Sequence, residues 1–119
     1  MKKFSIAISL GLLLLVFAGC SSAPEGTVAI KELQNTIGQR IGQEVVVVGT
    51  VDTSAGGMSI TKLFRLYRGS DAVWASVPEG TAEPPQGVLV RVTGVVAEKE
   101  FPAGIGRRVY IEAKSIRME

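Results

Sequence analysis

Two segments of the chain share the pattern V-x-V-x-G-x-V, and this pattern restricts the fold more than any other feature. The segments are 45–51 and 90–96. In each, alternate valines point to one side of a strand, and a glycine stands where the strand bends sharply. Because glycine usually weakens a strand, two at equivalent positions indicate the strong coiling that closes a small β-barrel.

Three further segments have the alternation of strands. They are 59–67, 72–77 and 107–113, and a hairpin turn at 68–71 joins the first two. The prolines and glycines of 78–87 fit neither a strand nor a stable helix interior, so they predict a loop. Five strands within roughly 75 residues predict a small closed or nearly closed barrel.

A short helix is expected before the first strand. Apolar residues recur there at intervals of three and four, the spacing of one helix face, at Ile30, Leu33, Ile37 and Ile41. Gly38 and Gly42 interrupt this pattern, which limits the helix to 28–35 or 28–36. Thr27 is the expected N-cap.

The first twenty residues have the composition of a processed leader. Lys2 and Lys3 precede an apolar, uncharged run at 4–17, which suits a signal-peptide core of roughly 7–15 residues better than a bilayer span of about 20. The residues at 17–20, Phe-Ala-Gly-Cys, resemble the lipobox of bacterial lipoproteins, with phenylalanine where leucine is commonest. The resemblance implies cleavage before Cys20 and attachment of acyl chains such as palmitate to its thiol. The alternative is an uncleaved apolar anchor with an incidental cysteine.

Lipidation would tether the mature protein to a membrane without spanning it. Each buried CH₂ contributes about 0.8 kcal/mol, so two or three acyl chains hold a protein almost permanently. We expect a signal peptide at 1–19, a lipidated tether at 20–26 and one folded domain at 27–119. The tether reaches about 20 Å at no more than ~3.5 Å per residue, so the domain lies near the lipid headgroups. The expected location is the extracytoplasmic side of the bacterial cell envelope, on the outer membrane if the host has one.

Charge and composition argue against several functions. Loss of Lys2 and Lys3 leaves eleven basic against eleven acidic residues, so the mature chain is neutral and general attraction to nucleic acid is not supported. The chain has no histidine and one cysteine, which excludes histidine-based catalysis and histidine metal sites. No carboxylate spacing demands a paired acid–base site or a calcium site. We therefore expect no enzyme activity, no cofactor and no metal.

The motifs together resemble one known fold. Ile37-Gly38, Ile41-Gly42, Phe64-x-Leu66, a turn with Gly69 and Pro85-x-Gly87 are arranged around the two V-x-V-x-G-x-V segments. Their order and spacing over 30–117 look like the OB-fold of the anticodon-binding type and its relatives in secreted bacterial proteins. The resemblance implies a mainly β, five-stranded OB-fold-like barrel with a short N-terminal helix. The proline-rich loop departs from it, since many OB-folds carry a helix there, and an SH3-like barrel is the alternative fold.

OB-folds commonly bind ligands across strands two and three, so the resemblance implies a binding surface. If Phe64 and Leu66 face inward, then Arg65, Tyr67 and Trp74 face outward on this surface. A guanidinium and two aromatic rings can stack on bases, sugars or protein side chains. Alternatively, Tyr67 and Trp74 pack against a loop or the helix.

Two connections and several basic residues border this surface. The glycine-rich segment 53–58 either closes over a ligand or forms a simple turn. The segment 98–108 reads as a long connection, in which Phe101 and Ile105 form either an exposed contact patch or a lid on the core. Four basic residues add local positive charge or are simply solvated: Lys62, Arg68, Arg107 and Arg108.

The sequence therefore predicts a membrane-anchored, non-catalytic module that binds an envelope protein or glycan through Arg65, Tyr67 and Trp74. The alternative is a single-stranded nucleic-acid-binding protein, which the neutral mature charge and the extracytoplasmic address both disfavour. A structural role, in which the domain shields or spaces something at the membrane surface, is a third hypothesis. The sequence does not indicate an oligomeric state.

Overall fold

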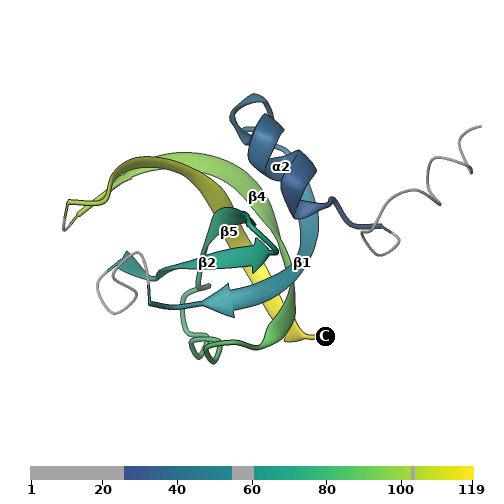
Figure 1. The fold of residues 1–119 in the computed structure, drawn as a ribbon. Coiled ribbons are helices and arrows are strands. Elements are labelled where there is room, and N and C mark those ends of the chain that lie inside the picture. The colour runs from purple at the N-terminus through teal and green to yellow at the C-terminus, as the bar shows by residue number, and fades with distance from the viewer. Residues whose placement is uncertain (1–25, 55–60, 103) are drawn as a thin grey trace, which may run out of the picture.

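The computed structural model describes residues 26–54, 61–102 and 104–119. Figure 1 shows a curved sheet closed into a barrel, with helix α2 at one side. The elements are α2 (Ile30–Thr36), the 3₁₀-helix η1 (Ile37–Gln39), β1 (Glu44–Asp52), β2 (Leu63–Arg68), β3 (Asp71–Ser76), β4 (Leu89–Phe101) and β5 (Gly106–Met118). The predicted signal peptide, Cys20 and most of the tether lie outside the described residues. Within them, no helix has the length and apolar character needed to cross a membrane.

The strands close in the order β1-β2-β3-β5-β4, with β4 paired back to β1. Neighbouring strands are antiparallel except β3 and β5, which run parallel and meet where Ala75 faces Ile111. The predicted mainly β, five-stranded barrel with a short N-terminal helix is confirmed. The loop predicted at 78–87 is also confirmed, because those residues belong to no helix or strand.

Helix α2 packs its apolar face on the barrel, since Ile30 and Leu33 are both buried in the main core. It begins later than predicted, and Thr27 as its N-cap is wrong. The N-cap is Ala29, whose side chain cannot cap, and the backbone N–H of Val28 donates to Val46 O at 2.9 Å. The residues before the helix are thus held in an extended conformation beside β1.

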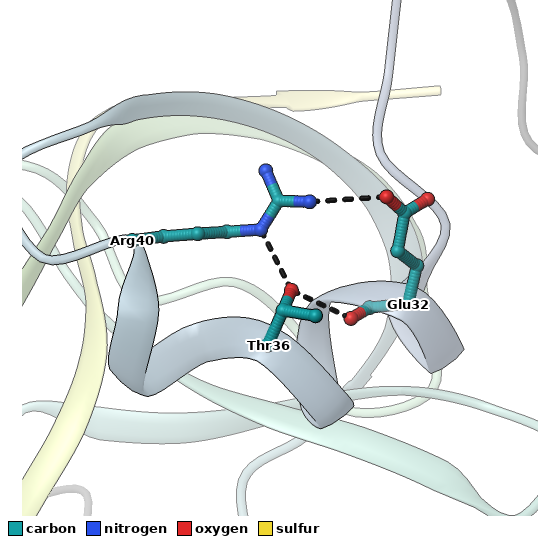
Figure 2. A network of polar contacts seen from close by, with 3 residues as sticks. All are labelled: Glu32, Thr36 and Arg40. Carbon is teal, nitrogen blue, oxygen red and sulfur yellow. Dashed lines mark hydrogen bonds and ion pairs between the residues drawn. The ribbon is translucent and has the colours of Figure 1, made fainter.

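A polar network continues the helix into η1, as Figure 2 shows. The Thr36 hydroxyl donates to the Glu32 carbonyl at 2.9 Å, and Arg40 Nε donates to Thr36 Oγ1 at 2.7 Å. Arg40 Nη2 also pairs with Glu32 Oε2 at 3.0 Å. These contacts turn the chain back toward α2 after the helix ends, so that Ile37 packs against the core.

Gln34 fastens the other side of α2 to the hairpin of β2 and β3. Its Oε1 accepts a hydrogen bond from Ala72 N at 2.8 Å, and its Nε2 donates to Asp71 Oδ1 at 3.2 Å. One side chain therefore binds both the backbone and a side chain where β3 begins. This contact fixes the helix relative to the strands that carry the predicted site.

The two glycines of the shared pattern allow close approaches that no side chain would permit. A Cβ on Gly49 would lie 2.6 Å from Ile30 Cδ1 and 2.9 Å from Leu66 Cγ. A Cβ on Gly94 would overlap Glu112 O and lie 2.8 Å from Ala113 Cα. The predicted role of these glycines in tight coiling thus has a steric basis.

A β-bulge lies beside Gly94. Thr93 pairs with Ser115 while Gly94 pairs with Ala113, so Lys114 is an extra residue in β5. The bulge shifts the side-chain alternation of β5 by one residue. After Ile111 and Ala113, a regular strand would point Ser115 into the barrel. Because of the bulge, Ile116 packs against the core instead.

Strands β4 and β5 are longer than predicted, and the prediction of 98–108 as a long connection is wrong. The two strands stay paired until Phe101 faces Gly106. This hairpin arm carries exposed charged residues at 98–100, which is why apolar alternation did not reveal it. Phe101 is packed and does not form an exposed contact patch, because its side chain is 6% exposed and lies in a cluster with Leu63 and Tyr110.

Candidate binding surface

The outer face of β2 and β3 carries the residues that the sequence predicts for binding. Phe64 and Leu66 are fully buried, while Arg65 and Tyr67 between and beyond them are half-buried. Trp74, which pairs with Arg65 across the two strands, is also half-buried. Cross-strand partners share one face of a sheet, so the three side chains lie on one surface.

Arg65 lies in a row of three residues that crosses three strands. It pairs with Asp52 on β1 and with Trp74 on β3. Its Cζ atom lies 5.8 Å from the centroid of the Trp74 ring, which is within cation–π range. The guanidinium thus lies beside the indole, and Asp52 occupies the same row on the neighbouring strand β1.

Asp52 was not among the predicted site residues. The pKa of its carboxyl lies below the ordinary value, chiefly because Ser54 donates hydrogen bonds from its side chain and backbone. Gln86 and the charge of Arg65 contribute less. Asp52 is thus ionised at neutral pH, and only the register between β1 and β2 places it beside Arg65.

A hollow of about 180 Å³ opens next to Arg65 and Tyr67. Asp52 borders it, and the turn between β2 and β3 closes it through Gly69, Ser70, Asp71 and Ala72. The hollow combines a cation, an aromatic ring and two carboxylates. It can accept a polar side chain or the edge of a small polar group.

Trp74 also faces the hairpin arm. It packs against a second small cluster formed by Leu63, Phe101 and Tyr110, outside the main core. The rings of Phe101 and Tyr110 meet edge to face, with centroids 5.1 Å apart and an interplanar angle of 80°. Trp74 therefore packs against side chains of β2, β4 and β5 rather than against the helix and remains half-buried, while its role in binding stays a prediction.

The basic residues around this surface are largely matched by other groups. Lys62 Nζ lies 3.6 Å from Glu83 Oε2, and Arg107 Nη1 lies 3.9 Å from Glu98 Oε2. Arg108 donates to the carbonyl of Arg107 at 3.1 Å. The surface is therefore of mixed charge and does not form a basic stripe.

The described parts of the chain contain no metal-binding group. Nowhere in 26–54, 61–102 or 104–119 do three histidine, cysteine or acidic side chains gather closely enough to hold an ion. The binding role of Arg65, Tyr67 and Trp74 stays a prediction, whereas their common placement follows directly from the strand register.

Comparison with known proteins gives structural matches only. No protein-family model and no curated protein matches the sequence. The telomere capping protein Ten1 from S. pombe aligns with a TM-score of 0.53 at 15% identity, over 80% of this chain and 81% of Ten1. The hypothetical protein ygiW from E. coli aligns with a TM-score of 0.54 at 17% identity, over 83% of this chain and 97% of ygiW.

A third similar structure is the OBody AM1L10 bound to hen egg-white lysozyme. It aligns with a TM-score of 0.54 at 25% identity, over 82% of this chain and 95% of the OBody. These neighbours are OB-fold proteins. Together with the closed five-stranded sheet and its strand order, they show that this chain has an OB-fold.

Proposed function

We propose that this protein is a non-catalytic binding module, held in the bacterial cell envelope by lipid on Cys20, that captures a partner through the outer face of β2 and β3. The observation that carries the proposal is the placement of Arg65 between Asp52 and Trp74, with Tyr67 on the same face. Arginine, tryptophan and tyrosine are the side chains that most often dominate binding energy at interfaces.

A protein partner is favoured over a glycan. The OBody, which is 25% identical to this chain, was solved bound to lysozyme, so this barrel type can support a protein-binding surface. The mixed charge around Arg65 also suits a protein surface, which offers both signs at close spacing. Glycan binding, which would use the aromatic rings alone, is an outcome that the experiment below distinguishes.

The proposal includes the absence of catalysis. General acids and bases work best with a pKa near the operating pH. Hydrogen bonds lower the pKa of the Asp52 carboxyl, the one beside Arg65, and so move it farther from neutral pH. The absence of histidine from the sequence supports the same conclusion.

Nucleic-acid binding is the second candidate, because Tyr67 and Trp74 offer stacking surfaces and one structural neighbour is a telomere capping protein. A titration with labelled oligonucleotides at several salt concentrations tests it. Binding that weakens steeply with salt would favour this candidate over the first.

Crosslinking in intact cells, followed by identification of the captured species, tests the first candidate. Replacing Arg65 and Tyr67 together by alanine should lower the yield of the captured partner about tenfold or more, because interface hot spots contribute about 2 kcal/mol each. Lys31→Ala is the control, since it removes an exposed cation from α2 and leaves the side chains of β2 and β3 in place.

Trp74→Ala is measured separately, with its melting temperature, because Trp74 also packs against the Leu63 cluster. Unchanged capture by a folded variant lacking Arg65, Tyr67 and Trp74 would remove the proposed surface. Capture of a glycan alone would replace the protein partner. Mass spectrometry of Cys20 decides the lipid anchor independently.

A further inference from the structure

A second polar surface lies on β4 and β5, which the predicted binding residues do not reach. Arg91 and Arg117 face each other across these strands, and Thr93 faces Ser115 in the next pair. With Met118 and Glu119, the four residues line a hollow of about 370 Å³. Two guanidiniums and two hydroxyls thus converge on one open depression.

Like charges directly opposite each other destabilise a sheet unless an anion offsets them. Glu119 supplies one such anion, accepting from Arg91 Nε at 3.0 Å and from Arg91 Nη2 at 2.9 Å. This bidentate pair fixes the orientation of the Arg91 guanidinium beside the hollow. The side chains that line the hollow thus include two guanidiniums and one carboxylate.

Several donors around the hollow are not engaged by other described residues. No hydrogen bond or ion pair from 26–54, 61–102 or 104–119 involves the side chain of Thr93, Ser115 or Arg117. Arg91 uses two of the roughly five N–H donors of a guanidinium. The hollow therefore offers charge and hydroxyl donors together, which is the combination that binds a phosphate group.

The hollow lies close to the point where the chain enters the domain. Val28 bonds to Val46, Val46 pairs with Thr93, and Thr93 pairs with Ser115. With about 4.8 Å between neighbouring strands, Val28 lies roughly 10 Å from Thr93 along this row. The predicted tether ends at residue 26, so the lipid anchor would hold this side of the barrel near the membrane.

Two exposed apolar residues lie at this end of β4 and β5. Leu89 is 43% exposed, and Met118, which is among the residues that line the hollow, is 66% exposed. Leu89 precedes Arg91 by two residues on β4, so both side chains project from the same side of the strand. Apolar side chains beside a cationic hollow match the chemistry of a bilayer surface, where phosphate lies above hydrocarbon.

We propose that this hollow binds the phosphate of an anionic phospholipid headgroup in the membrane that holds the lipid anchor. Arg117, Thr93 and Ser115 donate to the phosphate oxygens, and Arg91 contributes donors that Glu119 does not occupy. The inference rests on the proposed function because it uses the anchor at Cys20. The residues that line the hollow lie on β4, on the C-terminal part of β5 and just after it, whereas Arg65, Tyr67 and Trp74 lie on β2 and β3, so bound headgroups would leave the partner surface uncovered.

A phosphate titration tests the hollow itself. The purified acylated protein, in neutral detergent, is titrated with glycerol phosphate while NMR follows the backbone amides and arginine side chains. Signals of Arg91, Thr93 and Ser115 should shift, and Arg117→Gln should weaken binding about fivefold or more, since it removes a charge-assisted donor. Arg68→Gln is the matched control, because it removes the same charge from β2, and it should change binding less than twofold.

A second arm identifies the source of the phosphate. The acylated protein is placed in nanodiscs with phosphatidylglycerol and a paramagnetic headgroup lipid, and a fluorescent label is attached through Glu112→Cys or, separately, Arg68→Cys. Glu112 is exposed and lies on the outer face of β5. The headgroup lipid should quench the label at 112 more than the label at 68, and Arg117→Gln should reduce this difference.

Absence of shifts at the hollow, or equal weakening by Arg68→Gln, would overturn the proposal. Binding of glycerol phosphate without preferential quenching at 112 would overturn the assignment to a lipid headgroup. If mass spectrometry finds Cys20 unmodified, the proposed anchor fails on its own, and the phosphate titration still decides whether the hollow binds phosphate.

Discussion

Replacing Gly94 with alanine tests how the barrel closes. Gly94 lies at the bulge where β4 approaches β5, and a Cβ there would overlap Glu112 O and lie 2.8 Å from Ala113 Cα. An ordinary contact is 3.4 Å or longer, so the contact with Ala113 Cα alone requires the two strands to separate by about 0.6 Å, and the overlap with Glu112 O requires more. The obstacle is backbone, which cannot move aside as the end of a side chain can.

The cost follows from the crowding. Overpacking of this kind destabilises a protein by about 1–3 kcal/mol, and contact with backbone favours the upper end of that range. Alanine restricts the unfolded chain and returns about 0.4–1 kcal/mol. The net loss in free energy of unfolding is then about 2 kcal/mol, which for a domain of this size lowers the melting temperature by roughly 8–16 °C.

Thermal unfolding followed by circular dichroism measures this loss, with two matched controls. Gly38→Ala places the same methyl group in open space at an ordinary φ, so stability should be unchanged or slightly higher. Gly49→Ala should fall between the two, because its two nearest obstacles are side-chain atoms, Ile30 Cδ1 and Leu66 Cγ, and the nearest backbone atom, Tyr67 O, lies farther away at 3.1 Å. Equal melting temperatures for Gly94→Ala and Gly38→Ala would refute the close approach of β4 and β5.

Two further substitutions test the packing around the predicted site. Burial, with a smaller contribution from Glu112, raises the pKa of the Tyr110 hydroxyl above 10.0. The neutral phenol of Tyr110 therefore stabilises the folded state below pH 10.0, and this stabilisation is lost as the pH rises through the folded-state pKa. Tyr110→Phe should therefore flatten the alkaline fall in melting temperature, and an unchanged profile would contradict this. Gln34→Ala should cost about 1 kcal/mol and speed hydrogen exchange at Ala72, whereas the exposed Gln39→Ala should do neither.

The barrel could be predicted because its strands alternate between core and solvent. Val45, Val47, Val90 and Val92 are all buried, and each is separated from the next inward residue by one outward residue. The same period placed Arg65 and Tyr67 on the outer face. Alternation is a local property, so it can be recognised in the sequence before the strand pairing is known.

The errors occurred where tertiary contacts decided local structure. Thr27 has the chemistry of an N-cap, but the bond from Val28 to Val46 holds the preceding chain against β1. The arm of β4 and β5 is charged at 98–100, and its pairing persists because Phe101 and Tyr110 pack together against Leu63. Neither contact can be recognised from neighbouring residues.

The positions of residues on both surfaces depend on the register between paired strands, which is also set by tertiary contacts. Asp52 lies beside Arg65 only because β1 and β2 pair at that offset. Arg91 and Arg117 are far apart in the sequence, and the pattern around each resembles an ordinary solvated strand face. Their meeting could be predicted only by knowing that β5 contains an extra residue.

That extra residue, Lys114, links the core to the proposed phosphate site. If Lys114 paired with Thr93 in a regular ladder instead of forming the bulge, Ser115 would lie opposite Val92 and Ile116 opposite Arg91. Ile116 would then face outward, and Arg117 would point to the core opposite Val90. The bulge reverses both positions, so that Ile116 packs inside and Arg117 faces Arg91 outside. Because Gly94 permits the close approach at this bulge, the fold of the β4 and β5 pair and the charge on its outer face have one structural cause.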